Sequence, residues 1–129
     1  MRLRTVDSLM LLALVWMVVP RATWAQEEPR SRHFTTSDGV QLHYLEASSG
    51  PASLVFVPGW TMPAEIWEPQ LRHFASSHRV VALDPRGHGR SEKPGYGYHP
   101  LRRSLDIGEL LDHIGGEPAV VVGWSLGVP

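Results

Sequence analysis

The sequence predicts an α/β fold with a mostly parallel sheet and flanking helices. Three short segments are apolar on both faces, as expected of parallel strands covered by helices on each side: residues 54–57, 79–83 and 119–122. Helical segments alternate with them along the chain, which is typical of a parallel sheet. The length of 129 residues suits one domain.

The segments before the first buried strand predict an antiparallel pair. Residues 33–36 and 40–45 are separated by the turn signal Ser37-Asp38-Gly39. In the second segment every other residue is apolar, namely Val40, Leu42 and Tyr44. This alternation indicates a half-buried strand at the start of the sheet.

Two helices are expected between the buried strands. In the first, Pro69 suits the first turn, and Trp67, Leu71 and Phe74 share one face. The second spans residues 100–114 and ends at Gly115-Gly116. Its expected apolar face consists of Leu101, Leu105, Ile107, Leu110, Leu111 and Ile114.

The N-terminus has the layout of a secretory signal peptide. Arg2 and Arg4 precede an apolar run at residues 9–19, and small residues surround a cleavage position after Ala25. The run is shorter than the roughly 20 residues that span a bilayer. We therefore expect a signal peptide at 1–25, a linker at 26–32, a folded domain at 33–129, and a secreted or periplasmic location without stable membrane insertion. An uncleaved anchor and a misassigned start codon are the alternatives.

Composition excludes several classes of function. The net charge of −1 supplies no basic patch for nucleic acid, and the chain has no cysteine for disulfides or thiol chemistry. Gly87-His88-Gly89 lacks the third glycine of a dinucleotide motif. The histidines show no metal-ligand spacing and are expected to be scattered over the surface: His33, His43, His73, His78, His88, His99 and His113. We expect no metal and no organic cofactor.

A candidate nucleophile follows the last buried strand. Gly123-Trp124-Ser125-Leu126-Gly127 matches G-x-S-x-G, the nucleophile elbow, in which a serine stands at a sharp turn at the carboxyl edge of the sheet. The supporting glycines, Gly123 and Gly127, are expected where side chains would collide with neighbouring backbone. The pentapeptide alone favours an ordinary glycine-rich turn, and the buried strand before it together with the two motifs below favours the elbow.

A second motif, Pro58-Gly59-Trp60, ends the first buried strand. Acyl transfer needs backbone N–H groups that stabilise the developing oxyanion. We expect the amides of Trp60 and Leu126 to supply this oxyanion hole, with Gly59 allowing close approach. Trp124, like Trp60, is a candidate for lining a substrate pocket, and ordinary core packing is the alternative.

Together with Asp84-Pro85-Arg86-Gly87-His88-Gly89-Arg90-Ser91, these motifs resemble the α/β-hydrolase superfamily, in the group of serine esterases, lactonases, cofactor-free haloperoxidases, epoxide hydrolases and haloalkane dehalogenases. The resemblance covers roughly residues 34–129. It implies that Ser125 is the nucleophile and that the turn at residues 84–91 is structural, so His88 is not assigned as the base. Serine, in place of the aspartate of dehalogenases and epoxide hydrolases, favours an acyl-serine intermediate from a small ester, lactone or related acyl substrate. Perhydrolase and carbon–carbon hydrolase activities stay open.

The chain departs from the family pattern at two places. Pro58 replaces the usual histidine, which leaves the amide of Trp60 in place. In this fold the acid and histidine follow the serine, and only residues 126–129 follow Ser125. We expect the N-terminal portion of an α/β-hydrolase fold, truncated after the nucleophile elbow, inactive alone, with residues 119–122 as an aggregation-prone edge. The alternative is a non-catalytic remnant or interaction module.

Overall fold

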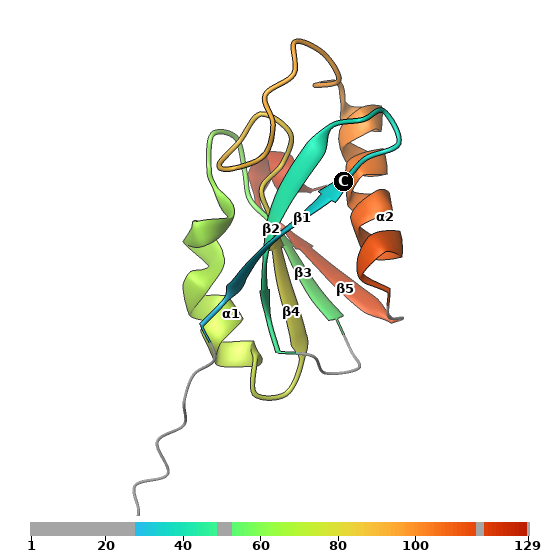
Figure 1. Cartoon of the computed structure of the whole chain (residues 1–129). Coiled ribbons are helices and arrows are strands. Elements are labelled where there is room, and N and C mark those ends of the chain that lie inside the picture. Colours follow the sequence, from blue (N-terminus) through green and yellow to red (C-terminus); the bar gives the residue numbers. More distant parts are fainter. Residues whose placement is uncertain (1–27, 49–52, 116–117, 129) are drawn as a thin grey trace, which may run out of the picture.

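The computed structural model describes residues 28–48, 53–115 and 118–128. It contains one five-stranded sheet with the strand order β1-β2-β4-β3-β5 (Figure 1). The strands are β1 (Arg30–Thr35), β2 (Gln41–Ala47), β3 (Ser53–Val57), β4 (Arg79–Leu83) and β5 (Ala119–Gly123). The signal peptide expected at residues 1–25 lies outside the described residues.

The sheet combines a parallel block with an antiparallel start. β3 pairs in parallel with β4 and with β5, so that Val55 lies opposite Val81 and Val121. β2 pairs antiparallel with β4 and with β1, where Phe34 lies opposite Leu42. The expected α/β class, the parallel strands and the antiparallel first pair are confirmed. Of the three parallel strands, β3 and β4 are buried as expected, whereas β5 is only partly buried.

The first strand begins inside the segment expected to be a linker. Residues 26–32 were assigned to the linker, whereas β1 starts at Arg30. The reason is the length of β2, which continues to Ala47 and gives Arg30 a partner in Glu46. Residues 30–32 are polar, so the sequence pattern did not predict a strand there. An edge strand with an exposed face needs few apolar residues.

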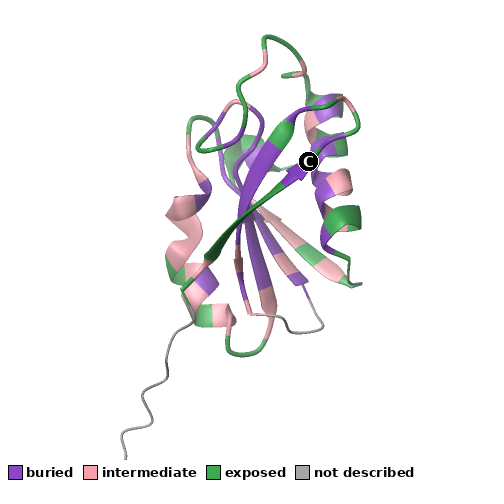
Figure 2. Cartoon of the chain, viewed as in Figure 1, coloured by how far each residue is buried: buried purple, intermediate pink, exposed green. Residues whose placement is uncertain are grey.

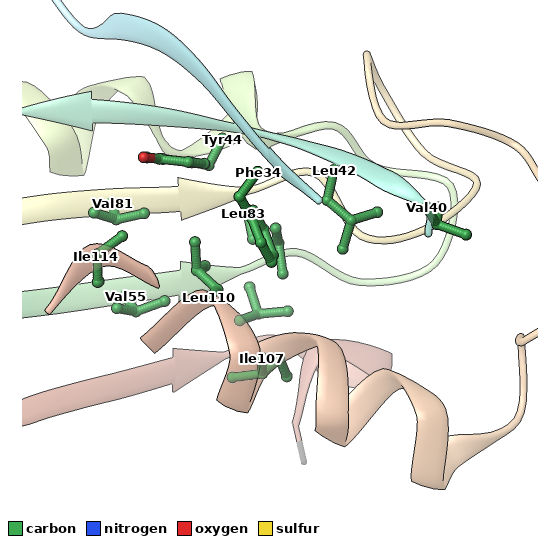
Figure 3. Packing of buried hydrophobic residues seen from close by; sticks show 11 residues of the cluster. Phe34, Val40, Leu42, Tyr44, Val55, Val81, Leu83, Ile107, Leu110 and Ile114 are labelled. Carbon is green, nitrogen blue, oxygen red and sulfur yellow. The ribbon is translucent and has the colours of Figure 1, made fainter. Parts of the chain in front are cut away.

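Helices cover both faces of the sheet (Figure 1). The 3₁₀ turn η1 (Ala64–Trp67) leads into α1 (Glu68–Phe74), which packs Leu71 into one core cluster with β4 residues such as Val80. On the other face α2 (Pro100–Ile114) contributes Ile107, Leu110 and Ile114 to the second cluster (Figure 3). Both expected helices are confirmed.

The buried face of α2 differs from the expected one. Leu101 and Leu105 are 68% and 47% exposed, while Arg102 and Asp106 are buried. Asp106 turns inward because it forms an ion pair with Arg86, whose side chain is fully buried. Arg102 and Asp106 are therefore buried on the face of α2 where the apolar pattern predicted Leu101 and Leu105.

The last strand has one free edge in the described part of the chain. β5 pairs with β3 only, and it ends the strand order. Its burial is lower than that of the central strands (Figure 2), and Val120 is 57% exposed. An exposed, apolar and uncharged strand edge is a template for pairing with other chains, so the expected tendency to aggregate stays a prediction.

Candidate active site

Ser125 stands where β5 ends and a short 3₁₀ turn, η2 (Ser125–Gly127), begins. Its φ of 53° lies in the left-handed region, which side-chain-bearing residues rarely occupy. Among the described residues, the other non-glycine positions with positive φ are Ser48 and Thr61, and Thr61 directly follows Trp60. Of these three strained positions, Ser125 is the expected nucleophile and Thr61 lies next to the expected oxyanion hole, and backbone strain is commonly found at such sites.

The supporting glycines are required by close contacts between backbone segments. A methyl group at Gly127 would overlap with the carbonyl oxygen of Val57 and lie 2.7 Å from that of Pro58. A methyl group at Gly123 would overlap with the carbonyl of Gly127. At Gly59 it would lie 3.2 Å from the Cβ of Ser125, so the ends of β3 and β5 converge on the serine.

The amides of Trp60 and Leu126 are available to a ligand. Two neighbouring amides have backbone acceptors, because Gly127 donates to the Trp124 carbonyl at 2.9 Å and Val128 donates to the Ser125 carbonyl at 3.1 Å. Within the described residues, the amides of Trp60 and Leu126 have no acceptor. N–H groups without an acceptor near a nucleophilic serine can bind a carbonyl oxygen that is gaining negative charge.

A cavity of about 270 Å³ lies beside the serine turn, between the carboxyl ends of β3 and β4 and helix α2. Trp60, Leu126 and Ile107 belong to its lining. Trp124 does not, and its side chain is 51% exposed. Trp60 is 59% exposed, so neither tryptophan is packed in the core.

The turn after β4 is held by its own aspartate. Asp84 is fully buried, and its carboxylate accepts hydrogen bonds from the amides of Ala64 at 2.6 Å and Arg90 at 2.8 Å. Ser91 donates to the Asp84 carbonyl at 2.6 Å. A side chain at Gly89 would overlap with the carboxylate. These contacts make the turn structural, as the resemblance implied.

Two histidines are not on the surface, which corrects the sequence-based expectation. His43 is fully buried and its Nδ1 lies 2.8 Å from the Asp84 carboxylate. His88 is 8% exposed, its Nδ1 lies 2.9 Å from the Arg86 carbonyl, and its ring packs edge-on against Trp60 with centroids 5.3 Å apart. Sequence reasoning missed both, because their partners are set by the fold and not by a spacing motif.

Arg86 joins the same turn to α2 and to the β1–β2 turn. Its buried guanidinium forms ion pairs with Asp106 at 2.9 Å and Asp38 at 2.8 Å. Hydrogen bonds from Arg86, then from Thr36, hold the pKa of Asp38 well below its ordinary value. The hydrogen bonds that Arg86 donates to Asp106 raise the pKa of Arg86, against the effect of burial. Arg86 therefore remains charged and fixes three segments beside the cavity.

Within residues 28–48, 53–115 and 118–128, no group of three or more metal-binding side chains is present. Over the same residues, the helices are too short or too polar to cross a bilayer.

Residues 52–127 match the family described as the alpha/beta hydrolase fold. The chain belongs to this family. It is 35% identical over 94 residues to a non-heme haloperoxidase of Rhodococcus erythropolis, covering 72% of this chain and 34% of that protein. It is 34% identical over 97 residues to a bifunctional esterase/perhydrolase of Acinetobacter calcoaceticus, covering 74% of this chain and 35% of that protein.

The solved structures agree with this assignment. An epoxide hydrolase from Vigna radiata superposes with a TM-score of 0.73 at 28% identity, covering 80% of this chain and 34% of that one. The chain thus spans about a third of the length of the relatives that it matches.

Proposed function

We propose that the protein is a serine hydrolase in which Ser125 attacks a small ester, lactone or related acyl compound. The observation that carries the proposal is the convergence of β3 and β5 on Ser125, with its left-handed backbone and the close approach of Gly59. The free amides of Trp60 and Leu126 support an oxyanion hole. The cavity beside them would receive the acyl group.

The choice of acyl chemistry rests on the nucleophile and on one relative. A serine hydroxyl forms an acyl ester that water can hydrolyse. The Acinetobacter protein, which is described as an esterase/perhydrolase, is compatible with this chemistry. Serine at position 125 is the reason to propose ester or lactone hydrolysis ahead of epoxide opening, although epoxide hydrolases are also among the relatives.

The test uses the full-length product of the gene that encodes this chain, since the acid and histidine of this fold follow the nucleophile. Hydrolysis of p-nitrophenyl butyrate and of a γ-lactone is compared for the parent and Ser125→Ala. We expect a loss of at least about 1,000-fold in kcat/KM. Ser77→Ala, which changes an exposed serine away from the cavity, is the matched control. Unchanged hydrolysis by Ser125→Ala would reject the proposal.

A binding module is the second candidate, and exposed apolar side chains around the serine favour it. Trp60, Trp124, Leu126 and Val128 are each between 45% and 61% exposed. An apolar patch of this kind is typical of an interaction surface. Loss of partner binding in Trp124→Ser, with no hydrolysis by the full-length parent, would favour this function over the enzyme.

We also propose export, with cleavage after Ala25. The apolar run at residues 9–19 and the small residues before the cleavage position support it. N-terminal sequencing of the protein recovered outside the cytoplasm should begin at Gln26. Recovery of Met1 in an exported form would indicate an uncleaved anchor.

A further inference from the structure

A second serine in the molecule is hydrogen-bonded to a histidine–aspartate pair, away from Ser125. The Ser31 Oγ lies 2.7 Å from the His43 Nε2, and the His43 Nδ1 lies 2.8 Å from the Asp84 Oδ2. Ser31 comes from β1, His43 from β2 and Asp84 from the end of β4. Both distances fall in the range at which a base can take the proton of a nucleophile.

The hydrogen bonds of Asp84 set the direction of proton donation in this relay. Its carboxyl oxygens already accept hydrogen bonds from the amides of Ala64 and Arg90, so the group acts as an acceptor. His43 therefore donates from Nδ1 to Asp84, and in the tautomer with its proton on Nδ1 the Nε2 atom is the acceptor. The Ser31 hydroxyl consequently donates to Nε2, the arrangement of a general base with an activated serine.

Burial divides the relay into a hidden part and an accessible part. The side chains of His43 and Asp84 are completely buried, whereas Ser31 is exposed on the edge strand. The ring of His33 packs against His43 with centroids 5.0 Å apart. A buried base of this kind is held in one orientation, and its acceptor atom is reached from solvent through the Ser31 hydroxyl.

We propose that Ser31 is a second nucleophilic serine, which takes an acyl or phosphonyl group from small activated esters. The Ser31 Oγ forms the new bond to carbon or phosphorus, the bond to the leaving group breaks, and the hydroxyl proton passes to the His43 Nε2. Asp84 stabilises the imidazolium that results. The leaving group departs as an anion, and the proton of His43 returns to solvent.

The exposed position determines the class of reagent. Ser31 stands on the open edge of the sheet, where water reaches the reacting centre and solvates the developing charge. A compound with a good leaving group, such as an aryl ester or a fluorophosphonate, requires less stabilisation of its transition state than an ordinary ester. We therefore assign stoichiometric modification by activated compounds to Ser31, separate from the turnover proposed for Ser125.

The experiment treats the 129-residue chain with a fluorophosphonate and locates adducts by peptide mass spectrometry. Ser77 is the internal control, because its Oγ lies 2.8 Å from the Nδ1 of His78 but no carboxylate contacts that histidine among the described residues. We expect Ser31 to react about tenfold or more faster than Ser77. The adduct should persist in Ser125→Ala and disappear in Ser31→Ala.

Because mapping identifies the residue in the unaltered chain, the outcome does not depend on the folding of a variant. Ser31 left unmodified in the folded chain, or modified no faster than Ser77, overturns the proposal. Urea-unfolded chain provides a second reading, since Ser31 should lose its advantage over Ser77 when His43 is released. An equal advantage in the unfolded chain also contradicts the relay. Adducts on Ser125 are mapped separately, so the two proposals succeed or fail independently.

Discussion

The turn after β4 and the turn after β5 lie at the same edge of the sheet but are stabilised in different ways. The β4 turn is built around buried charges: Asp84 accepts three N–H hydrogen bonds, and Arg86 pairs with two carboxylates. The β5 turn contains no charged side chain and is shaped by glycines packed against backbone carbonyls. Polar side-chain contacts therefore stabilise the β4 turn, whereas the β5 turn depends on close backbone packing that only glycine allows.

This difference separates the supporting part of the site from its reactive part. Removing one partner of a buried ion pair costs several kcal/mol of stability, so the β4 turn is held in one conformation beside the site. The β5 turn leaves its serine exposed and two nearby amides without acceptors. The molecule thus satisfies its polar groups beside the site and leaves them free where a substrate would bind.

Removing the aspartate of the β4 turn should lower the free energy of unfolding more than the other changes below. Asp84→Ala leaves the buried Ala64 amide, the partly buried Arg90 amide and the buried His43 without their acceptor, at a cost of about 3–5 kcal/mol. Urea unfolding followed by circular dichroism measures the change. Asp112→Ala, which alters an exposed aspartate of α2, is the control and should change stability by less than about 0.5 kcal/mol. Similar losses in both variants would show that the buried hydrogen bonds of Asp84 do not stabilise the β4 turn.

Adding one methyl group to the β5 turn should have the next largest effect. Gly127→Ala forces the new carbon against the carbonyls of Val57 and Pro58, with an expected loss of about 1–3 kcal/mol. Gly95→Ala, where nothing lies within 4 Å, is the matched control in the same unfolding assay. If the two variants unfold alike, close packing does not shape the serine turn.

Acid should weaken the β4 turn in a way that depends on Asp38. The pKa of its carboxyl is lower in the folded protein than its ordinary value of 3.8, because Arg86 and Thr36 donate hydrogen bonds to it. Its contribution is therefore fully present above about pH 4 and is lost as the pH falls below that value. Thermal melting at pH 7, 4 and 3 should show a smaller acid-dependent decrease for Asp38→Asn than for the parent. Parallel curves would contradict this assignment.

The smallest expected change in stability is an increase, caused by a substitution inside α2. Gly108 lies inside α2 with no atom within 4 Å of an added methyl group. Gly108→Ala should raise the free energy of unfolding by about 0.5–1 kcal/mol, because alanine has the higher helix propensity. Urea unfolding checks this value. A loss of stability would show that a methyl group at position 108 is unfavourable despite the open space around it.

Sequence patterns predicted the elements whose signals are local. The β4 bounds and both ends of α2 follow from apolar runs, Pro100 and Gly115, and the elbow glycines follow from one motif. The polar strand that begins at Arg30 and the exposed Leu101 were not predicted, since pairing partners and buried charges decide them.

The relation between Asp84 and His43 was also beyond local patterns. The two residues are 41 positions apart, and only the antiparallel pairing of β2 with β4 brings them together. The roles of Ser125, Trp60 and Leu126 stay predictions, although the fold places Ser125 and Leu126 at one turn and brings Gly59 against it.

The contact of Gly127 with the carbonyls of Val57 and Pro58 has a consequence for protein engineering. It couples the ends of two strands so tightly that the serine turn offers no room for gradual mutational adjustment. Variation aimed at new substrates should therefore be directed to the exposed side chains of Trp60, Leu126 and Trp124, where libraries can sample residues without displacing the strand ends.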